Sequence, residues 1–165
     1  MYNLVFIIVN TVLAGFVAIL MAEMTSKMKK VYQCLILLPF MISMVIVSYL
    51  VFGFLSSDNG FLNNTILPLL GKEKINWYME KKYWPFLLTF VNAWKVSGYN
   101  CIIYISTILG IDRGIYESAS IDGASKWKQI SKITIPLLKP TIIMMTLLAV
   151  GRIFYSDFGL FYQVP

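Results

Sequence analysis

The chain has 165 residues, of which 58% are hydrophobic and only 13% are charged. Because soluble globular domains carry about 25% charged residues, this composition excludes an ordinary soluble fold and predicts an all-α protein embedded in a lipid bilayer. The net charge of +6 comes from lysines and arginines in short segments beside apolar runs, which is typical of membrane proteins, so no nucleic-acid partner is expected.

The residues that most catalytic and metal sites need are missing from this sequence. It contains no histidine, so neither a Ser-His-Asp nor a Cys-His arrangement can form. Cys34 and Cys101 lie in separate apolar segments and make neither a disulfide framework nor a zinc site. No G-x-x-x-x-G-K-[S/T] phosphate-binding loop is present, so the chain does not hydrolyse ATP by itself. We therefore expect no enzymatic activity, no metal and no cofactor.

Two segments without charged residues, 3–22 and 32–55, are expected to span the membrane. The first 22 residues would form a helix of about 33 Å, enough for a hydrocarbon core of about 30 Å. A cleaved signal peptide is disfavoured, because no basic region precedes the apolar run and no small-x-small site follows it. Pro39 lies inside the second segment and should kink it unless a helix begins there. The short basic segment 23–30 connects the two spans.

The long connection 56–85 carries a cluster of aromatic residues near its end. Such residues prefer the membrane–water interface, so an interfacial loop with short surface helices is the favoured interpretation. Long loops are frequently functional, and contact with an external partner is a second hypothesis. The aromatic residues are Trp77, Tyr78, Tyr83 and Trp84.

The third and fourth expected spans, 86–109 and 141–162, contain charges at membrane depth. Lys95 should either snorkel to the outer surface or face an internal aqueous path. Arg152 and Asp157 should face protein or water, because a charge in hydrocarbon is costly. Aromatic faces beside polar groups suit sugar rings, although helix packing is the favoured explanation for any single aromatic. The candidates for a translocation path are Lys95, Arg152, Tyr155, Asp157 and Phe158.

The polar segment 110–140 is expected to form two short helices that meet at a bend. Asp122 is a good N-cap for the second helix, and Gly123 can adopt a positive φ at no steric cost. Pro136 should end that helix, and Pro140 fits the first turn of the next one. An ordinary polar connection between two membrane helices is the alternative. The second helix has an apolar face, formed by Trp127, Ile130 and Ile133.

The spacing within this segment resembles the EAA loop of the membrane subunits of bacterial ABC importers. Its residues fit the pattern E-A-A-(x3)-G-(x9)-I-x-L-P, and the extended form E-x-A-x-x-D-G-A also holds. The sequence departs from the pattern at Ser118 and Ile135, where size or apolarity is kept. The resemblance assigns an ATPase-coupling loop to Glu117, Ser118, Ala119, Asp122, Gly123, Ala124, Trp127, Ile133 and Pro136.

The flanking sequences extend the resemblance through nearly the whole chain. The stretches AWKVSGYNCIIYISTILGID and GRIFYSDFGLFYQVP look like carbohydrate-uptake permeases of the maltose and multiple-sugar class, closest to the branch for polysaccharides and oligosaccharides. Such subunits have a core of six helices, and four are visible here. The resemblance therefore implies a partial permease, expected to lack the first and last core helices.

The resemblance also implies partners and a place in the cell. These are two cytoplasmic ATPase subunits, a second permease subunit, an extracellular solute-binding lipoprotein and a sugar. The loops at 23–30 and 110–140 hold three and five lysines and arginines, against four in the longer loop 56–85. This bias places the coupling loop in the cytoplasm of a protein of the bacterial plasma membrane. The alternatives are another cargo, such as amino acids, peptides, phosphonates or metals, and a small non-transporting scaffold protein.

Overall fold

The computed structural model describes residues 2–154 and 159–164, and every regular element in that part of the chain is a helix. The prediction of an all-α fold is therefore confirmed. In chain order the elements are α1 (Tyr2–Ala22), α2 (Ser26–Met41), α3 (Met44–Leu55), the π-helical segment η1 (Leu62–Ile66), α4 (Leu67–Leu69), α5 (Trp84–Leu109), α6 (Arg113–Ile121), α7 (Lys126–Gln129), η2 (Ile130–Thr134), α8 (Ile135–Val150) and η3 (Gly159–Gln163).

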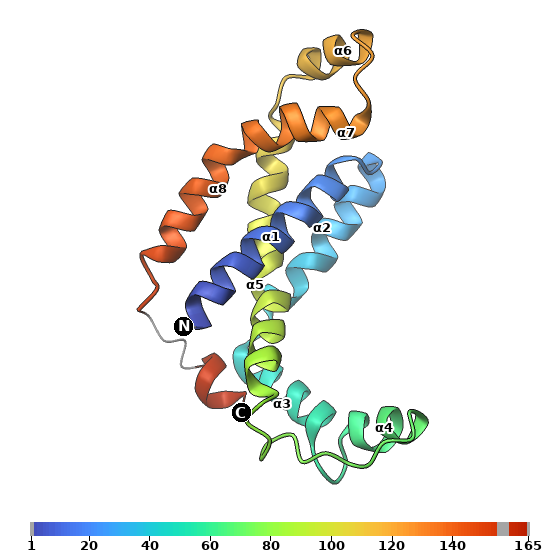
Figure 1. Ribbon diagram of the computed structural model, residues 1–165, viewed down its shortest axis with the longest axis vertical. Helices are drawn as coiled ribbons and strands as arrows, with labels where there is room; N and C mark the ends of the chain where they lie inside the picture. The colour runs from blue at the N-terminus through green and yellow to red at the C-terminus, as the bar shows by residue number, and fades with distance from the viewer. Residues whose placement is uncertain (1, 155–158, 165) are drawn as a thin grey trace.

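Helix α5 is the central rod of the molecule, and α1, α2 and α8 pack around it (Figure 1). Ala14 and Ala18 of α1 are fully buried one turn apart, and their small side chains allow a close approach. Cys101 and Tyr104 of α5 and Leu138 of α8 complete the same buried cluster. In Figure 1, α6 and α7 lie at one end of the long axis and α3 and α4 at the other.

Within the described residues, two helices are long and apolar enough to cross a membrane, namely α1 and the continuous helix Lys126–Val150. The pair Lys27–Met41 and Met44–Leu55 adds a third span if its two bent halves count as one. Helix α5 has 26 residues, a length of about 39 Å, but several polar side chains make it less apolar. Four membrane spans stay a prediction.

The second expected span is interrupted by a bend of 92° between α2 and α3. The backbone leaves the helix at Ile42, three residues after Pro39, with ψ 134°. A helix end leaves carbonyl groups without partners, and here the Nζ of Lys95 supplies donors. It donates to the carbonyl oxygens of Pro39 and Phe40, both at 3.3 Å, and to that of Ile42. The Lys95 ammonium is thus held at the bend, and its position relative to the membrane surface stays a prediction.

Gly98 brings α2 and α5 into backbone contact one turn further along α5. A Cβ atom placed on Gly98 would overlap the carbonyl oxygen of Ile36 in α2. Because that obstacle is backbone, no rotamer change could relieve the overlap. Lys95 and Gly98 therefore fix the first half of the bent segment to the central helix.

The prediction that Pro136 ends a helix is wrong. The chain from Lys126 to Val150 is one continuous helix of 25 residues, with Pro136 and Pro140 inside it. The π-helical turn η2 explains this, because the N–H of Ile135 donates to the carbonyl oxygen of Ile130. Such local adjustments let membrane helices accommodate proline without breaking.

The fourth expected span also ends earlier than residue 162. Helix α8 stops at Val150, and residues 151–154 form turns. The short segment η3 then packs against α3, with Leu160 and Val164 fully or almost fully buried beside Val47. In the described residues, α8 and η3 are therefore two separate elements.

The connection between α3 and α5 is organised around a buried amide. Asn63 has no exposed surface and accepts hydrogen bonds from the N–H of Ile75 at 3.1 Å and from Nε1 of Trp77 at 3.2 Å. The aromatic rings of Tyr78 and Trp84 lie 5.4 Å apart, centroid to centroid. Partial burial raises the pKa of Tyr78 above its ordinary value. Internal packing thus orders this cluster, and contact with an external partner stays a hypothesis.

Candidate functional site

The polar segment between α5 and α8 forms a compact knob, defined here as residues 112–134, at one end of the molecule (Figure 1). Asp112 caps α6, since its Oδ1 accepts a hydrogen bond from the N–H of Gly114 at 2.9 Å. The expectation that Asp122 caps the second helix is wrong, because Asp122 lies at the C-terminal end of α6. Ser125 caps α7 instead, and its Oγ accepts from the N–H of Lys128 at 3.4 Å.

Gly123 forms the bend of the knob, and its φ of +74° agrees with the sequence prediction. The N–H of Gly123 donates to the carbonyl of Ser120 at 3.1 Å, and the N–H of Ala124 to that of Ala119 at 2.9 Å. This pair of bonds is the Schellman motif, in which the residue after the helix cap adopts the left-handed conformation. That motif also explains the position of Asp122, because it needs a cap residue directly before the glycine.

Three side chains that the sequence analysis missed stabilise the knob from inside. Gln129 is 4% exposed, and its Nε2 donates to the Oγ of Ser120 at 2.8 Å and to the carbonyl of Ala124 at 3.2 Å. The hydroxyls of Tyr116 and Thr134 share a hydrogen bond of 2.9 Å. These bonds join α6 to α7 and η2, so the knob is held as one unit. Among neighbouring lysines, Gln129 had the pattern of a surface residue.

The outer surface of the knob presents large apolar side chains. Ile121 is 87% exposed and Trp127 is 76% exposed, whereas Ile130 and Ile133 are half-buried. The predicted apolar face is therefore divided between surface and interior. Of the other predicted loop residues, Ala119 and Ala124 are half-buried, and the exposed ones are Glu117, Ser118, Asp122, Gly123 and Pro136. Exposed apolar side chains on two adjoining short helices suit docking into a groove.

One exposed ion pair connects the knob to the segment that follows α1. Nζ of Lys126 lies 3.4 Å from Oε2 of Glu23, with side chains 74% and 49% exposed. Such surface pairs contribute little stability because solvent screens them. The internal bonds of Gln129 and Tyr116 are therefore the main restraints on the knob.

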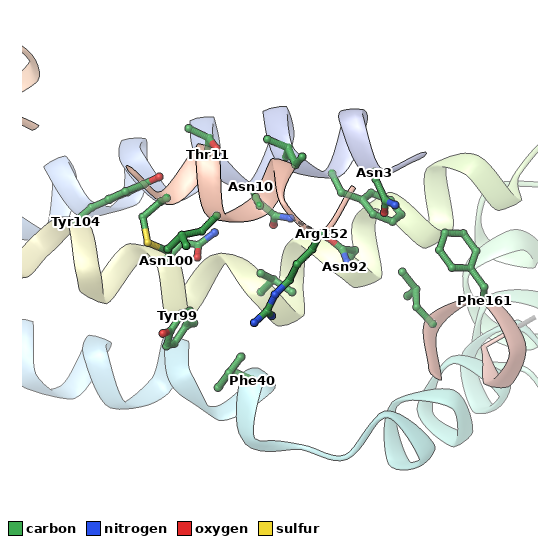
Figure 2. Close-up of a pocket in the computed structure, with 17 residues that line it drawn as sticks. Asn3, Asn10, Thr11, Phe40, Asn92, Tyr99, Asn100, Tyr104, Arg152 and Phe161 are labelled. Atoms are coloured by element: carbon green, nitrogen blue, oxygen red, sulfur yellow. Dashed lines mark hydrogen bonds between the residues drawn. The ribbon is translucent and has the colours of Figure 1, made fainter. Parts of the chain in front are cut away.

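A cavity of about 620 Å³ lies between α1, α5 and α8, far from the knob. Figure 2 shows that amide side chains from α1 and α5 face it. Nδ2 of Asn10 donates to Oδ1 of Asn92 at 2.7 Å, and Asn10 is only 6% exposed. Oδ1 of Asn10 has no hydrogen-bond partner in the described part of the chain. The hydroxyl of Tyr104, which is fully buried near Thr11, also makes no hydrogen bond of normal geometry there.

The other side of the cavity combines a cation with a stacked aromatic pair. Arg152 follows α8 and extends into the space between the labelled side chains in Figure 2. The rings of Phe40 and Tyr99 lie 5.0 Å apart with an interplanar angle of 16°, and both side chains stay more than two-fifths exposed. The cavity therefore offers amide groups, a guanidinium and flat apolar faces together.

Of the residues that the sequence suggested for a translocation path, the structure describes Lys95 and Arg152, and it places them in different surroundings. Arg152 lines the cavity, but Lys95 is not among the described lining residues, because it is held at the α2–α3 bend. Tyr155, Asp157 and Phe158 lie outside the described residues. The sequence analysis missed Asn10 and Asn92, although an amide within an otherwise apolar span is a recognisable signal.

Residues 5–156 match the sequence profile of the family described as "binding-protein-dependent transport system inner membrane component". The chain is similar to the polygalacturonan/rhamnogalacturonan transport system permease protein YteP of Bacillus subtilis, with 36% identity over 74% of this chain and 38% of the relative. It is also similar to the lactose transport system permease protein LacF of Rhizobium radiobacter, with 34% identity over 88% of this chain and 50% of the relative.

A solved structure has the same fold. A chain of a bacterial ABC transporter involved in the import of the acidic polysaccharide alginate matches with a TM-score of 0.86 and 31% identity, over 95% of this chain and 56% of that chain. The same transporter in complex with an alginate pentasaccharide-bound periplasmic protein matches with a TM-score of 0.85. The chain thus spans from about two-fifths to just over half the length of these proteins.

Proposed function

The chain belongs to the family of binding-protein-dependent transport system inner membrane components, and from that membership we propose that it is the membrane-spanning part of a permease subunit that imports sugars or oligosaccharides. The names of its relatives support this cargo class, because they include permeases for polygalacturonan, lactose and arabinooligosaccharides. The structural similarity to a chain of the alginate importer also supports this cargo class. In such a system the ATP is hydrolysed by separate subunits, and this chain is not an enzyme.

The observation that carries the proposal is the geometry of the knob. Ile121 and Trp127 offer an apolar surface that suits a groove on a cytoplasmic ATPase subunit. Gly123 sets the bend, and Gln129 ties both arms together. Because α7 continues into α8 without a break, a displacement of the knob passes directly to a helix of the membrane. Closure of two ATPase subunits would in this way alternate the access of the cavity between the two sides.

The remaining partners follow from the same assignment. A second permease subunit would complete the pathway, and a solute-binding lipoprotein would deliver the sugar from outside. The alginate pentasaccharide-bound periplasmic protein seen with the neighbouring transporter supports that delivery. The higher number of lysines and arginines near the knob supports its place in the cytoplasm.

The test uses Gly123, whose Cβ position is open but whose φ is positive. A Cβ atom there would meet nothing within 4 Å, so a substitution acts through backbone conformation alone. Gly123→Val forces the bend to change, whereas Gly123→Asn can keep it, because asparagine tolerates the left-handed region. In the transporter assembled with its partner subunits, we expect Gly123→Val to lower sugar-stimulated ATPase activity by about tenfold or more, a coupling loss of about 1.4 kcal/mol.

Membrane insertion should be equal for both variants, and Gly123→Asn should keep most of the stimulated activity. If sugar-stimulated ATPase activity were normal in Gly123→Val, the knob would not transmit motion from the ATPase subunits to the membrane helices. If the intact chain captured no ATPase subunit in a pull-down, the permease assignment itself would fail and a scaffold protein would be favoured.

A further inference from the structure

A second pocket lies where the knob meets the segment that follows α1. Its volume is about 590 Å³, and its lining comes from the last turns of α1 and α5, the first turns of α2, and the knob. Ala22 is the last residue of α1, and Lys126 is the first residue of the helix Lys126–Val150. In the described part of the chain these are the two helices long and apolar enough to cross a membrane, so their ends mark a boundary between lipid and water. The pocket therefore lies at the level of the phospholipid headgroups.

The lining of this pocket is basic. Its charged side chains, among the described residues, are Lys29, Lys30, Arg113, Lys126 and Glu23. The described lining residues all belong to the stretch 19–134, and every acidic residue of that stretch is described. Four cations thus face one carboxylate.

Two of these cations are available to a ligand. Nζ of Lys126 lies 3.4 Å from Oε2 of Glu23, and Nζ of Lys29 donates to the carbonyl oxygen of Ala22 at 2.9 Å. Lys30 of α2 and Arg113 of α6 are exposed, and neither makes an ion pair with another described residue. A guanidinium binds the oxygens of a phosphate through parallel hydrogen bonds, and an ammonium adds a point charge.

The rest of the lining is largely apolar. It includes Ile19 of α1, Ile108 and Leu109 of α5, and Ile130 of η2. A free phosphate ion gains nothing from such side chains, whereas the glycerol and acyl carbons of a phospholipid gain from their burial. The combination of cations and apolar side chains therefore favours a lipid over a soluble anion.

We infer that this pocket binds the headgroup of an anionic phospholipid, whose phosphate pairs with Lys30 and Arg113 while its acyl chains follow the apolar side chains. Basic pockets between helices at the membrane surface bind headgroups of this kind. The volume falls within the range of about 300–1,000 Å³ typical of small-ligand sites. The inference goes beyond the proposed function, because it depends on the position of the pocket and not on the cargo.

A matched pair of lipids tests the role of charge. Dioctanoyl-phosphatidylglycerol and dioctanoyl-phosphatidylcholine carry the same acyl chains and a phosphate, but choline adds a positive charge that the cations of the pocket repel. Native mass spectrometry of the intact chain, released from detergent after titration with each lipid, gives the two affinities. We expect phosphatidylglycerol to bind at least about tenfold more tightly. Inorganic phosphate, added as a competitor, should not displace it.

A double variant and its matched control locate the site. Lys30→Gln combined with Arg113→Gln should lower the affinity for phosphatidylglycerol about tenfold or more and remove the preference over phosphatidylcholine. Lys72→Gln combined with Lys74→Gln removes the same charge from the connection between α4 and α5 and should leave the preference unchanged. Equal circular dichroism spectra would show that both variants keep their helices.

Four outcomes would overturn the inference. Equal affinity for the two lipids would remove the role of charge, and equal losses in both double variants would indicate general attraction to a basic protein. Displacement by inorganic phosphate would assign the pocket to a soluble anion. Displacement of the lipid by an added ATPase subunit would assign it to a protein interface. The ATPase pull-down and the Gly123 variants decide the proposed function separately.

Discussion

The α2–α3 pair and the helix Lys126–Val150 both contain proline, yet the first is bent by 92° and the second continues without a break. Pro39 lies three residues before the bend, whereas Pro136 and Pro140 lie inside an uninterrupted helix. Proline removes a backbone donor in both places, so its presence does not decide the outcome. The surroundings of the carbonyl groups at the end of the helix decide it.

At the bend, those carbonyl groups have a fixed cationic partner. Lys95 donates to three of them from α5, and Gly98 keeps α2 close enough for the contact. The helix Lys126–Val150 has no such cationic partner at its carbonyl groups among the described residues, and only 11% of its most apolar window is buried, against 33% for α1. Its prolines are accommodated by the π-helical turn instead. A membrane helix thus bends where a neighbouring helix stabilises the open end.

The largest effect is expected from breaking the close approach of α2 and α5. Gly98→Ala places a methyl group on the carbonyl oxygen of Ile36, and backbone must move to relieve it. We expect a loss of about 3 kcal/mol in the free energy of unfolding, at the upper end for overpacked cores. Denaturation of the chain in detergent, followed by tryptophan fluorescence, measures this loss.

Gly15→Ala is the matched control, with an expected change of opposite sign. A Cβ atom on Gly15 of α1 would meet nothing within 4 Å, so alanine should stabilise the helix by about 0.5–1 kcal/mol. If both alanine variants changed the free energy of unfolding equally, the contact between the α2 and α5 backbones would not explain the effect of Gly98→Ala.

A smaller effect is expected from removing the cation at the bend. Lys95→Met leaves the carbonyl groups at the end of α2 without their donor, which should cost about 2 kcal/mol and loosen the bend. Spin labels on the exposed Cys34 and on Leu50→Cys report the distance across it, while the buried Cys101 stays unlabelled. We expect a broader distance distribution, partly restored by Lys95→Arg. An unchanged distribution would rule out capping by Lys95.

The smallest effect is expected from the proline itself. Because Lys95 and Gly98 hold the bend, Pro39→Ala should leave the distance between the same two labels unchanged. Pro140→Ala should likewise leave the helix Lys126–Val150 continuous, and it serves as the companion variant. If α2 and α3 straightened in Pro39→Ala, the proline ring would determine the bend, and Lys95 and Gly98 would not.

The local features of the knob could be predicted from the sequence because they depend on neighbouring residues. Gly123 adopts a positive φ that other residues rarely adopt, and the residue type alone predicts this property. A kink near Pro39 was expected from the proline, and a bend is present there, although contacts from α5 hold it. The all-α membrane fold followed from composition, since so few charges cannot cover a soluble surface.

The remaining features depend on contacts between distant segments, which no local pattern contains. Lys95 reaches carbonyl groups more than fifty residues away, so its role at the bend could not be derived from its own helix. The pairing of Asn10 with Asn92 joins residues 82 apart. Pro136 was misjudged because η2 changes the hydrogen-bond spacing before it.

The unbroken course of Lys126–Val150 has a geometric consequence at its far end. A helix of 25 residues is about 37 Å long, so a tilt of about 10° about its first residue moves the last one through an arc of about 6 Å. Arg152 follows only two residues later, at the rim of the cavity. A small rotation at the knob would therefore be magnified into a larger displacement of the guanidinium at the cavity.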